Sequence, residues 1–257
     1  MSLLLALSGA WLLASPGVWQ TEMVVPQQSA LVPVQAIVVR LDPSHVRFAL
    51  DRSSKDYGMV PDWTVERMPP AALVAFNAGQ FAGGAPWGWF VRDGVEVQPA
   101  GAGPLSMAFV VNKAGAVSLN GPDEVPAARR DAVQAFQSYP ALLIGDGRIP
   151  AQLQASGRGV DLAHRDSRLA IGILRDGSIV VALTRTDLLG RGGETLPWGP
   201  TVPEMAAFMK SLGCVRAMLL DGGLSGQLAI RGPQGVSSWK NWRPVPLGLM
   251  AFPRTGH

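Results

Sequence analysis

The residues best suited to chemistry in this sequence are Asp221, Gly222 and Gly223, which follow an apolar run that ends at Leu220. A carboxylate at a strand end can act as a general acid or base, or can bind sugar hydroxyls. Two glycines directly after it let the backbone approach a ligand closely and leave two N–H donors available. The same residues are also typical of a β-turn with a solvated Asp, because Asp-Gly is a strong hairpin signal. Both interpretations stay open for this segment taken by itself.

Two further polar residues stand at the ends of apolar runs. Asn77 follows Leu73 to Phe76 and precedes Ala78 and Gly79. Its amide offers a donor and an acceptor to a sugar, but Asn also tolerates the left-handed geometry of a structural corner. Arg168 opens an apolar strand, and its planar guanidinium suits phosphate, although an Arg at a strand start is usually just solvated. Function in α/β folds is usually placed at the carboxyl ends of buried strands.

Other kinds of site have little support in the sequence. His45, His164 and His257 lack metal-ligand spacing, which argues against zinc. Ser225 stands in no Gly-x-Ser-x-Gly elbow, and there is no phosphate loop or dinucleotide motif. Cys214 is the single cysteine, so an intrachain disulfide is excluded and burial in a strand is expected. No cofactor is predicted with certainty; a divalent cation such as Ca²⁺ on oxygen ligands stays open, and the metal site is unknown.

Composition sets the fold class and limits the partners. The chain has 257 residues, 47% of them apolar, which is enough to bury the core of one large domain. Its 30 glycines and 21 prolines favour many tight connections between short strands. The net charge of +3 comes from scattered arginines without a basic run, which argues against a nucleic-acid partner.

The elements that must position these residues are mostly hairpin strands. Two predicted hairpins turn at Asp93-Gly94 and Asp176-Gly177. Apolar spacing predicts helices over 126–137 and 202–212, the second with a Thr201 to Glu204 capping box. We therefore expect an α+β fold: a single compact domain of mixed, mostly antiparallel strands with a few helices packed on the sheet. The predicted strands are 34–41, 45–50, 73–76, 89–92, 95–98, 107–112, 116–119, 141–144, 168–174, 179–184 and 216–220.

The N-terminus has features of an export signal. Residues 3–14 are apolar and uncharged, with the length of a secretory signal core, although no positive residue precedes them. The stretch is too short for a stable membrane span. We expect a signal segment over 1–25, a domain over 34–257, and a periplasmic or secreted location.

Three motifs in one order resemble the phosphodiester glycosidase family. They are Asn-x-Gly-x-Phe from Asn77, Arg-x-Ala-Ile-Gly from Arg168, and Leu-Asp-Gly-Gly-x-Ser from Leu220, and the similarity extends over about 34–253. The chain departs from the family at Asp166-Ser167-Arg168-Leu169, where His-Pro-Arg-Thr is common, and at Ala78, where Gly is common. These departures suggest an altered substrate or a weakened activity.

The resemblance implies a site and a reaction. It implies hydrolysis at the anomeric carbon of a sugar 1-phosphodiester, with Asp221 activating water or steadying the oxocarbenium-like centre and Arg168 neutralising the phosphate. Glycosidases generally use two carboxylates, and Asp187 is our candidate for the second. The substrate is expected to be a phosphorylated glycan or another glycosyl phosphodiester. The residues implied to line the substrate pocket are Asn77, Gly79, Gly222, Gly223, Ser225 and Arg243.

Two other functions stay open on the sequence. One is a non-catalytic protein that binds glycans or cell-envelope polymers, which the lack of a second carboxylate near Asp221 would favour. The other is a metal-assisted phosphodiesterase, which would release a sugar phosphate instead of a free sugar. Tryptophans that could stack on a sugar ring are Trp87, Trp89, Trp239 and Trp242.

Overall fold

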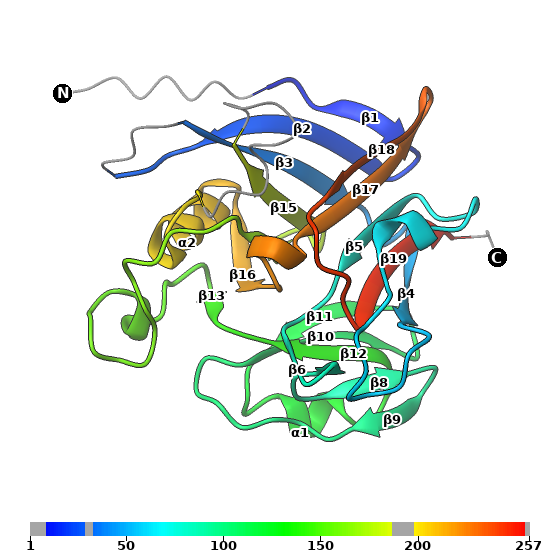
Figure 1. The fold of residues 1–257 in the computed structure, drawn as a ribbon, viewed down its shortest axis with the longest axis horizontal. Coiled ribbons are helices and arrows are strands. Elements are labelled where there is room, and N and C mark those ends of the chain that lie inside the picture. The colour runs from blue at the N-terminus through cyan, green and yellow to red at the C-terminus, as the bar shows by residue number, and fades with distance from the viewer. Residues whose placement is uncertain (1–8, 29–32, 187–197, 255–257) are drawn as a thin grey trace.

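The computed structural model describes residues 9–28, 33–186 and 198–254. The fold is predominantly β, built from three large antiparallel sheets (Figure 1). The α+β expectation is therefore corrected, because the described residues include only two short α-helices, α1 (Val125–Ala128) and α2 (Val202–Ser211). The expectation of mostly antiparallel strands is confirmed.

The seven-stranded sheet carries the segments that end near the candidate site. Its strand order is β1-β2-β3-β15-β14-β16-β13, and α2 covers one face. Arg168 immediately precedes β14, and Asp221 follows β16 by two residues. The strands are β1 (Leu12–Ser15), β2 (Val18–Val25), β3 (Val34–Leu41), β13 (Ala141–Leu143), β14 (Leu169–Leu174), β15 (Ile179–Arg185) and β16 (Cys214–Leu219).

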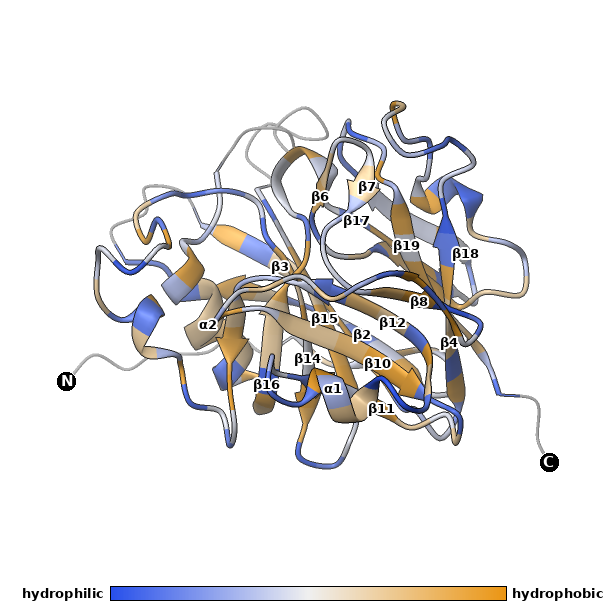
Figure 2. Ribbon diagram, turned by 90° about the horizontal axis from the view of Figure 1, so that it is seen from below, coloured by the Kyte–Doolittle hydropathy of each residue, from blue (hydrophilic) through white to orange (hydrophobic). Residues whose placement is uncertain are grey.

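The two five-stranded sheets supply the other walls of the apolar core. One has the order β11-β10-β12-β8-β9 and the other β18-β17-β5-β19-β4, and a two-stranded ribbon pairs β6 with β7. One apolar cluster takes residues from all three large sheets, and the hydropathy view shows apolar strands with polar connections around them (Figure 2). The strands are β4 (Val46–Arg52), β5 (Val74–Asn77), β6 (Phe81–Ala82), β7 (Ala85–Pro86), β8 (Phe90–Arg92), β9 (Val95–Gln98), β10 (Met107–Asn112), β11 (Val117–Asn120), β12 (Ala132–Ser138), β17 (Gln227–Gly232), β18 (Gly235–Lys240) and β19 (Leu247–Pro253).

Local turn and cap signals lead to the expected elements. The hairpins at Asp93-Gly94 and Asp176-Gly177 join β8 to β9 and β14 to β15. Helix α2 has both bonds of the capping box between Thr201 and Glu204. Gly213 has φ +87° directly after the C-cap, and β16 follows at once. The helix therefore feeds the strand that leads to Asp221.

The helix predicted over 126–137 is wrong beyond its first residues. Residues 132–138 form β12, which pairs with β10 and β8 in the middle of a sheet. Both faces of β12 are buried: Phe136 packs in the cluster shared by the sheets, whereas Ala132 and Ala135 pack in a separate cluster. A short strand buried on both faces shows no clear alternation, so its apolar residues can imitate helical spacing.

The described domain begins earlier than residue 34. Strand β2 pairs with β3 from Val18↔Leu41 to Val25↔Val34, and Val18 and Val25 are buried. Residues 12–25, expected within a signal segment, are thus part of the seven-stranded sheet, while residues 1–8 lie outside the described ranges. Neither α-helix in the described parts of the chain has the length or apolarity that a membrane crossing needs.

Candidate functional site

The Asp221-Gly222-Gly223 turn lies between the end of β5 and the segment before β14. The Asp221 N–H donates to Ala78 O at 3.2 Å, and the Gly223 N–H donates to Ser167 O at 2.7 Å. After the turn, Gly223–Ser225 form a 3₁₀ turn. Three segments that are far apart in the sequence therefore meet at one place.

The glycines of the site permit close backbone packing. A Cβ on Gly222 would lie 2.5 Å from Ser167 O and 3.3 Å from Arg168 Cα. Gly223 has φ +55°, and a Cβ there would lie 2.6 Å from Asp166 Oδ2. A Cβ on Gly79 would overlap Gln137 O. Their substrate contacts stay predictions; the structure shows that larger residues would push the three segments apart.

Asn77 is a fully buried corner residue at the end of β5. Its Oδ1 accepts a hydrogen bond from the Gln227 N–H at 2.8 Å, and its Nδ2 donates to Asp221 O at 2.7 Å. The Asn77 amide thus binds backbone groups, including that of Asp221, which agrees with a structural role for Asn77 at a corner of the chain. Because Asn77 is fully buried, its visible contribution is to fix the position of Asp221, and a direct contact with substrate stays a prediction.

The Asp221 carboxyl group is half-buried among charged neighbours. Burial raises the pKa of Asp221, and the negative charge of Asp166 raises it further. A hydrogen bond from Ser225 and the positive charge of Arg243 act in the opposite direction. Asp221 therefore retains its proton to a higher pH than an ordinary Asp, which suits a general acid.

Asp166 is the carboxylate that sequence reasoning missed. Its Oδ2 is directed at Gly223, its Oδ1 accepts the Ser167 N–H at 2.8 Å, and its side chain is 25% exposed. His164 Nε2 lies 3.7 Å from Asp166 Oδ2. The available signal was the departure from the family motif, because Asp166 stands where His is common. Asp187, the residue predicted for this role, lies outside the described residues.

Arg168 lines a cavity beside the turn. Its Nη2 donates to His164 O at 2.7 Å and its Nε donates to Pro200 O at 3.2 Å. Desolvation lowers the pKa of Arg168, and the carboxylates of Asp166 and Asp161 oppose that shift. The backbone therefore fixes the guanidinium in position, and the Asp166 carboxylate acts electrostatically on both Arg168 and Asp221.

Arg243 also lies next to the turn. Its backbone N–H donates to Leu224 O at 2.9 Å, and its guanidinium lies 4.9 Å from the centre of the Phe81 ring. The residue is exposed, and its charge acts on Asp221. A guanidinium that stacks on an aromatic ring and faces solvent is available to an anionic ligand.

Gln80 links the turn to β12, and sequence reasoning gave it no role. Its Oε1 accepts from Ser138 Oγ at 2.6 Å and from the Tyr139 N–H at 3.0 Å. Its Nε2 donates to Tyr139 O and, at 3.4 Å, to Leu220 O. The Asn77 to Gln80 segment thus holds both the Asp221 turn and the Tyr139 wall of the cavity.

The described residues contain no group of three or more His, Cys, Asp or Glu side chains arranged to hold a metal ion. Cys214 is buried, as expected, and burial raises the pKa of its thiol to about 12. The charged side chains that the structure describes at the site are Asp221 and Asp166, with Arg243 and Arg168 near them.

Comparisons with known proteins agree with the motifs. Zebrafish N-acetylglucosamine-1-phosphodiester α-N-acetylglucosaminidase, as a catalytic domain auto-inhibited by its pro-peptide, is similar at a TM-score of 0.71 and 20% identity, over 96% of this chain and 87% of that one. A hypothetical protein from Synechocystis is similar at a TM-score of 0.61 and 17% identity, over 93% of this chain and 63% of that one. A putative exported protein from Burkholderia pseudomallei is similar at a TM-score of 0.54 and 18% identity, over 86% of this chain and 74% of that one. At these identities the likeness is one of fold.

No curated protein is significantly similar to the chain in sequence. The model of the phosphodiester glycosidase family matches residues 71–252, which is more than half of the chain and includes all three motifs. The resemblance seen in those motifs is thereby confirmed, and the chain belongs to the phosphodiester glycosidase family.

Proposed function

We propose that this protein hydrolyses the glycosidic bond of a sugar 1-phosphodiester and releases the free sugar. The observation that carries the proposal is that Asp166 packs against Gly223 of the Asp221 turn, so that the charges of Asp166 and of the exposed Arg243 both act on the Asp221 carboxyl group. Two carboxyl groups in different environments are the usual equipment of a glycosidase. The family match supports the same reaction class.

The two carboxyl groups take different roles in this proposal. Water attacks the anomeric carbon while Asp166 accepts a proton from that water, and the bond between the anomeric carbon and the phosphate oxygen breaks. Asp221, whose pKa is raised by burial, donates its proton to the departing phosphate oxygen. The products are a free sugar and a phosphate monoester, so protons and bonds balance.

The arginines supply the charge that the phosphate group needs. Arg243 is exposed and its charge acts on Asp221, and Arg168 lines the adjacent cavity. Phosphate becomes a good leaving group when cations hold its negative charge, and fixed cations do so without reorganisation. Arg168 has an immobile guanidinium, because two backbone carbonyls hold it.

A product assay on a panel of α-glycosyl phosphodiesters tests the proposal. We expect free sugar from the parent protein and none from Asp221→Asn. Release of a sugar phosphate, lost on addition of a chelator, would instead assign a metal-assisted phosphodiesterase. Tight binding of every panel member without turnover would assign a non-catalytic glycan binder.

The location of the protein is a separate proposal. Residues 3–14 favour export to the periplasm or beyond, but β1 and β2 occupy residues 12–25 of the fold. An exported form is therefore expected to keep at least β2. Fractionation followed by N-terminal sequencing of the mature chain would check this.

A further inference from the structure

Large apolar side chains are exposed directly beside the Asp221 turn. Leu224, in the middle of the 3₁₀ turn, is 56% exposed, and Trp242 is 78% exposed. The two residues that flank Trp242 donate their backbone N–H groups to the carbonyls of residues 224 and 226, at 2.9 and 3.2 Å. The backbone is therefore anchored to the turn while it holds both side chains at the surface.

A second apolar group comes from the loop that follows β4. The loop exposes three large apolar side chains, Tyr57, Met59 and Val60, at 36%, 58% and 80%. The Gly58 N–H donates to Gly83 O at 2.8 Å, at the turn between β6 and β7. The loop is therefore held against the β6–β7 ribbon.

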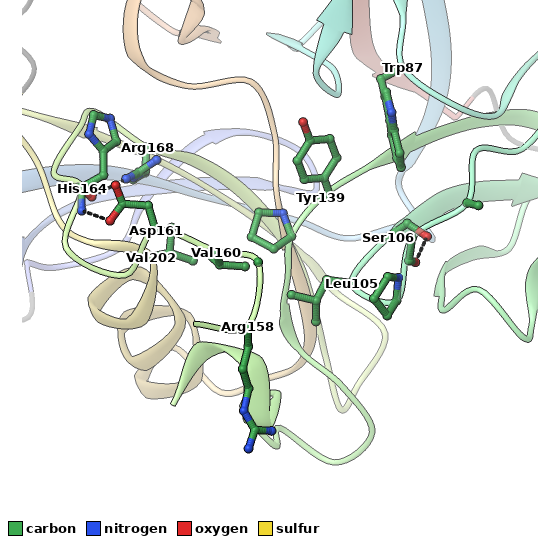
Figure 3. A pocket seen from close by; sticks show the side chains of 15 residues that line it. Trp87, Leu105, Ser106, Tyr139, Arg158, Val160, Asp161, His164, Arg168 and Val202 are labelled. Atoms are coloured by element: carbon green, nitrogen blue, oxygen red, sulfur yellow. Dashed lines mark hydrogen bonds between the residues drawn. The ribbon is translucent and has the colours of Figure 1, made fainter. Parts of the chain in front are cut away.

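The β6–β7 ribbon joins the two groups. Phe81 in β6 lies 4.9 Å from the Arg243 guanidinium, measured to the centre of the ring, and Figure 1 shows β6 next to the chain that leads into β19. We call Tyr57, Met59, Val60, Leu224 and Trp242 the apolar rim. On its other side, Gln80 accepts the Tyr139 N–H, and Tyr139 lines a cavity together with Trp87 (Figure 3).

Exposed cations stand among the side chains of the apolar rim. Arg243 follows Trp242, and Lys55 precedes Tyr57 in the loop after β4; both cations are exposed. The neighbouring carboxylates are each paired with another cation, in the pairs Asp56–Arg52, Asp62–Arg67 and Glu66–Lys240. The apolar rim therefore presents positive charge together with apolar surface.

This combination fits an anionic lipid surface. Soluble monomers rarely expose large contiguous apolar patches that bind nothing. Trp is enriched where lipid headgroups meet acyl chains, because its ring is apolar and its N–H is polar. A purely apolar protein partner would bury Lys55 and Arg243 without a counter-ion, whereas anionic lipids supply phosphate groups.

We propose that the apolar rim docks on the surface of an anionic lipid bilayer. Leu224 and Trp242 enter the boundary between headgroups and acyl chains, and Lys55 contacts a lipid phosphate. The Asp221 turn then faces the bilayer, so the substrate of the site is a glycosyl phosphodiester carried by a membrane lipid. The docking stands on the apolar rim alone, whereas this substrate class rests on the proposed hydrolysis.

Vesicle sedimentation of the full chain tests the docking. We expect binding to vesicles that mix phosphatidylcholine with phosphatidylglycerol, and weaker binding to phosphatidylcholine alone. Trp242→Ser should lower the partition coefficient about tenfold, the loss expected when one large apolar side chain no longer inserts. Lys55→Gln should lower it about fivefold, on the mixed vesicles only, the effect of one basic residue near an anionic surface.

Trp11→Ser is the matched control for Trp242→Ser. Trp11 is 42% exposed directly before β1, at an edge of the seven-stranded sheet, and it follows the apolar residues 3–7. The partition coefficient of Trp11→Ser should stay at the parental level. Equal losses for the two variants would assign vesicle binding to the N-terminal residues and overturn the proposal. A parent that binds neither kind of vesicle, or both kinds equally, would overturn it as well.

Paired substrates separate the docking from the proposed hydrolysis. One is an α-glycosyl methyl phosphodiester in solution, and the other carries the same glycosyl phosphate on diacylglycerol in mixed vesicles. Val60→Ser should lower kcat/KM severalfold on the vesicle substrate and leave it at the parental level on the soluble one. Val236→Ser is the control, because Val236 is an exposed valine in β18, and it should leave both values unchanged.

The outcomes for the two proposals are distinct. Equal effects of Val60→Ser on the two substrates, at unchanged thermal stability, would overturn the membrane-borne substrate class. No free sugar from either substrate would overturn the proposed hydrolysis and this substrate class with it, while sedimentation would still decide the docking. Hydrolysis of the soluble substrate by a parent that does not bind vesicles would overturn the docking and leave the proposed hydrolysis intact.

Discussion

At the residue scale, the proposed hydrolysis depends on both Asp166 and Asp221. Positioned acid–base groups typically contribute about 10²–10⁴-fold to a rate. We therefore expect Asp166→Asn to lower kcat on the α-glycosyl phosphodiester that the parent protein hydrolyses by about 10²-fold or more. Asp176→Asn is the control, because Asp176 is an exposed hairpin residue bonded to Arg40. Parental kcat for Asp166→Asn would return the second-carboxylate role to Asp187.

The raised pKa of Asp221 predicts a stability cost that depends on pH. Its carboxyl group ionises less readily in the folded chain than in the unfolded chain, so ionisation at neutral pH destabilises the fold. Asp221→Asn should raise Tm at pH 7 by roughly 2 °C, the response of a domain of this size to about 1 kcal/mol. The gain should shrink as the pH falls through the folded pKa of Asp221 and vanish below the ordinary Asp range. A gain that is the same at pH 3 and pH 7 would contradict this.

Gly223 allows the close packing of Asp166 to be measured separately from backbone strain. Gly223 and Gly177 both have positive φ, but a Cβ on Gly223 would meet Asp166 Oδ2 and a Cβ on Gly177 would meet nothing within 4 Å. Gly177→Ala should cost about 1 kcal/mol of unfolding free energy for the strained φ. Gly223→Ala should cost more and also lower kcat, because Asp166 must move. If urea denaturation gives the same loss of unfolding free energy for Gly223→Ala and Gly177→Ala, the Asp166 side chain can move away from the new Cβ at no cost, which would contradict this prediction.

At the element scale, local signals predicted the hairpins and α2 better than they predicted β12. Asp-Gly turns and the Thr201 to Glu204 capping box depend on residues close in sequence, so their geometry follows from local chemistry. Residues 132–138 form a strand because they pair with β10 and β8, and this pairing cannot be recognised from the residues of the segment alone. The motifs likewise indicated Asp221, but Asp166 depends on a contact across the fold.

Strand β2 leads to a prediction about the N-terminus. Its pairing with β3 extends from Val18 to Val25, and both of these residues are buried. A chain that starts at residue 26 should lose several kcal/mol of stability or fail to fold, because β3 would lose one of its two neighbouring strands, become an edge strand, and lose the apolar residues of β2 that pack beside it. A chain that starts at residue 9 keeps every described contact and should unfold like the parent. Equal midpoints in urea for the two truncations would contradict the role of β2.

At the scale of the whole molecule, the site depends on all three large sheets. Asn77 comes from one five-stranded sheet, Arg168 and Asp221 border strands of the seven-stranded sheet, and Tyr139 follows β12 of the other. Asn77 and Gln80 join these segments through buried and half-buried hydrogen bonds. Sequence order alone could not show this convergence, because antiparallel sheets connect residues that are far apart in the chain.

The shared core predicts that the three sheets unfold together. One apolar cluster includes Phe76, Phe109 and Ile171, one from each large sheet, so no sheet can separate without exposing the faces of the other two. In urea we expect the loss of β circular dichroism and the change in tryptophan fluorescence to coincide in one transition. Trp89 directly precedes β8 and Trp239 lies in β18, strands of different five-stranded sheets, so Trp89→Phe and Trp239→Phe report on each sheet in turn. Separate midpoints for the two variants, at equal overall stability, would show that the sheets unfold independently.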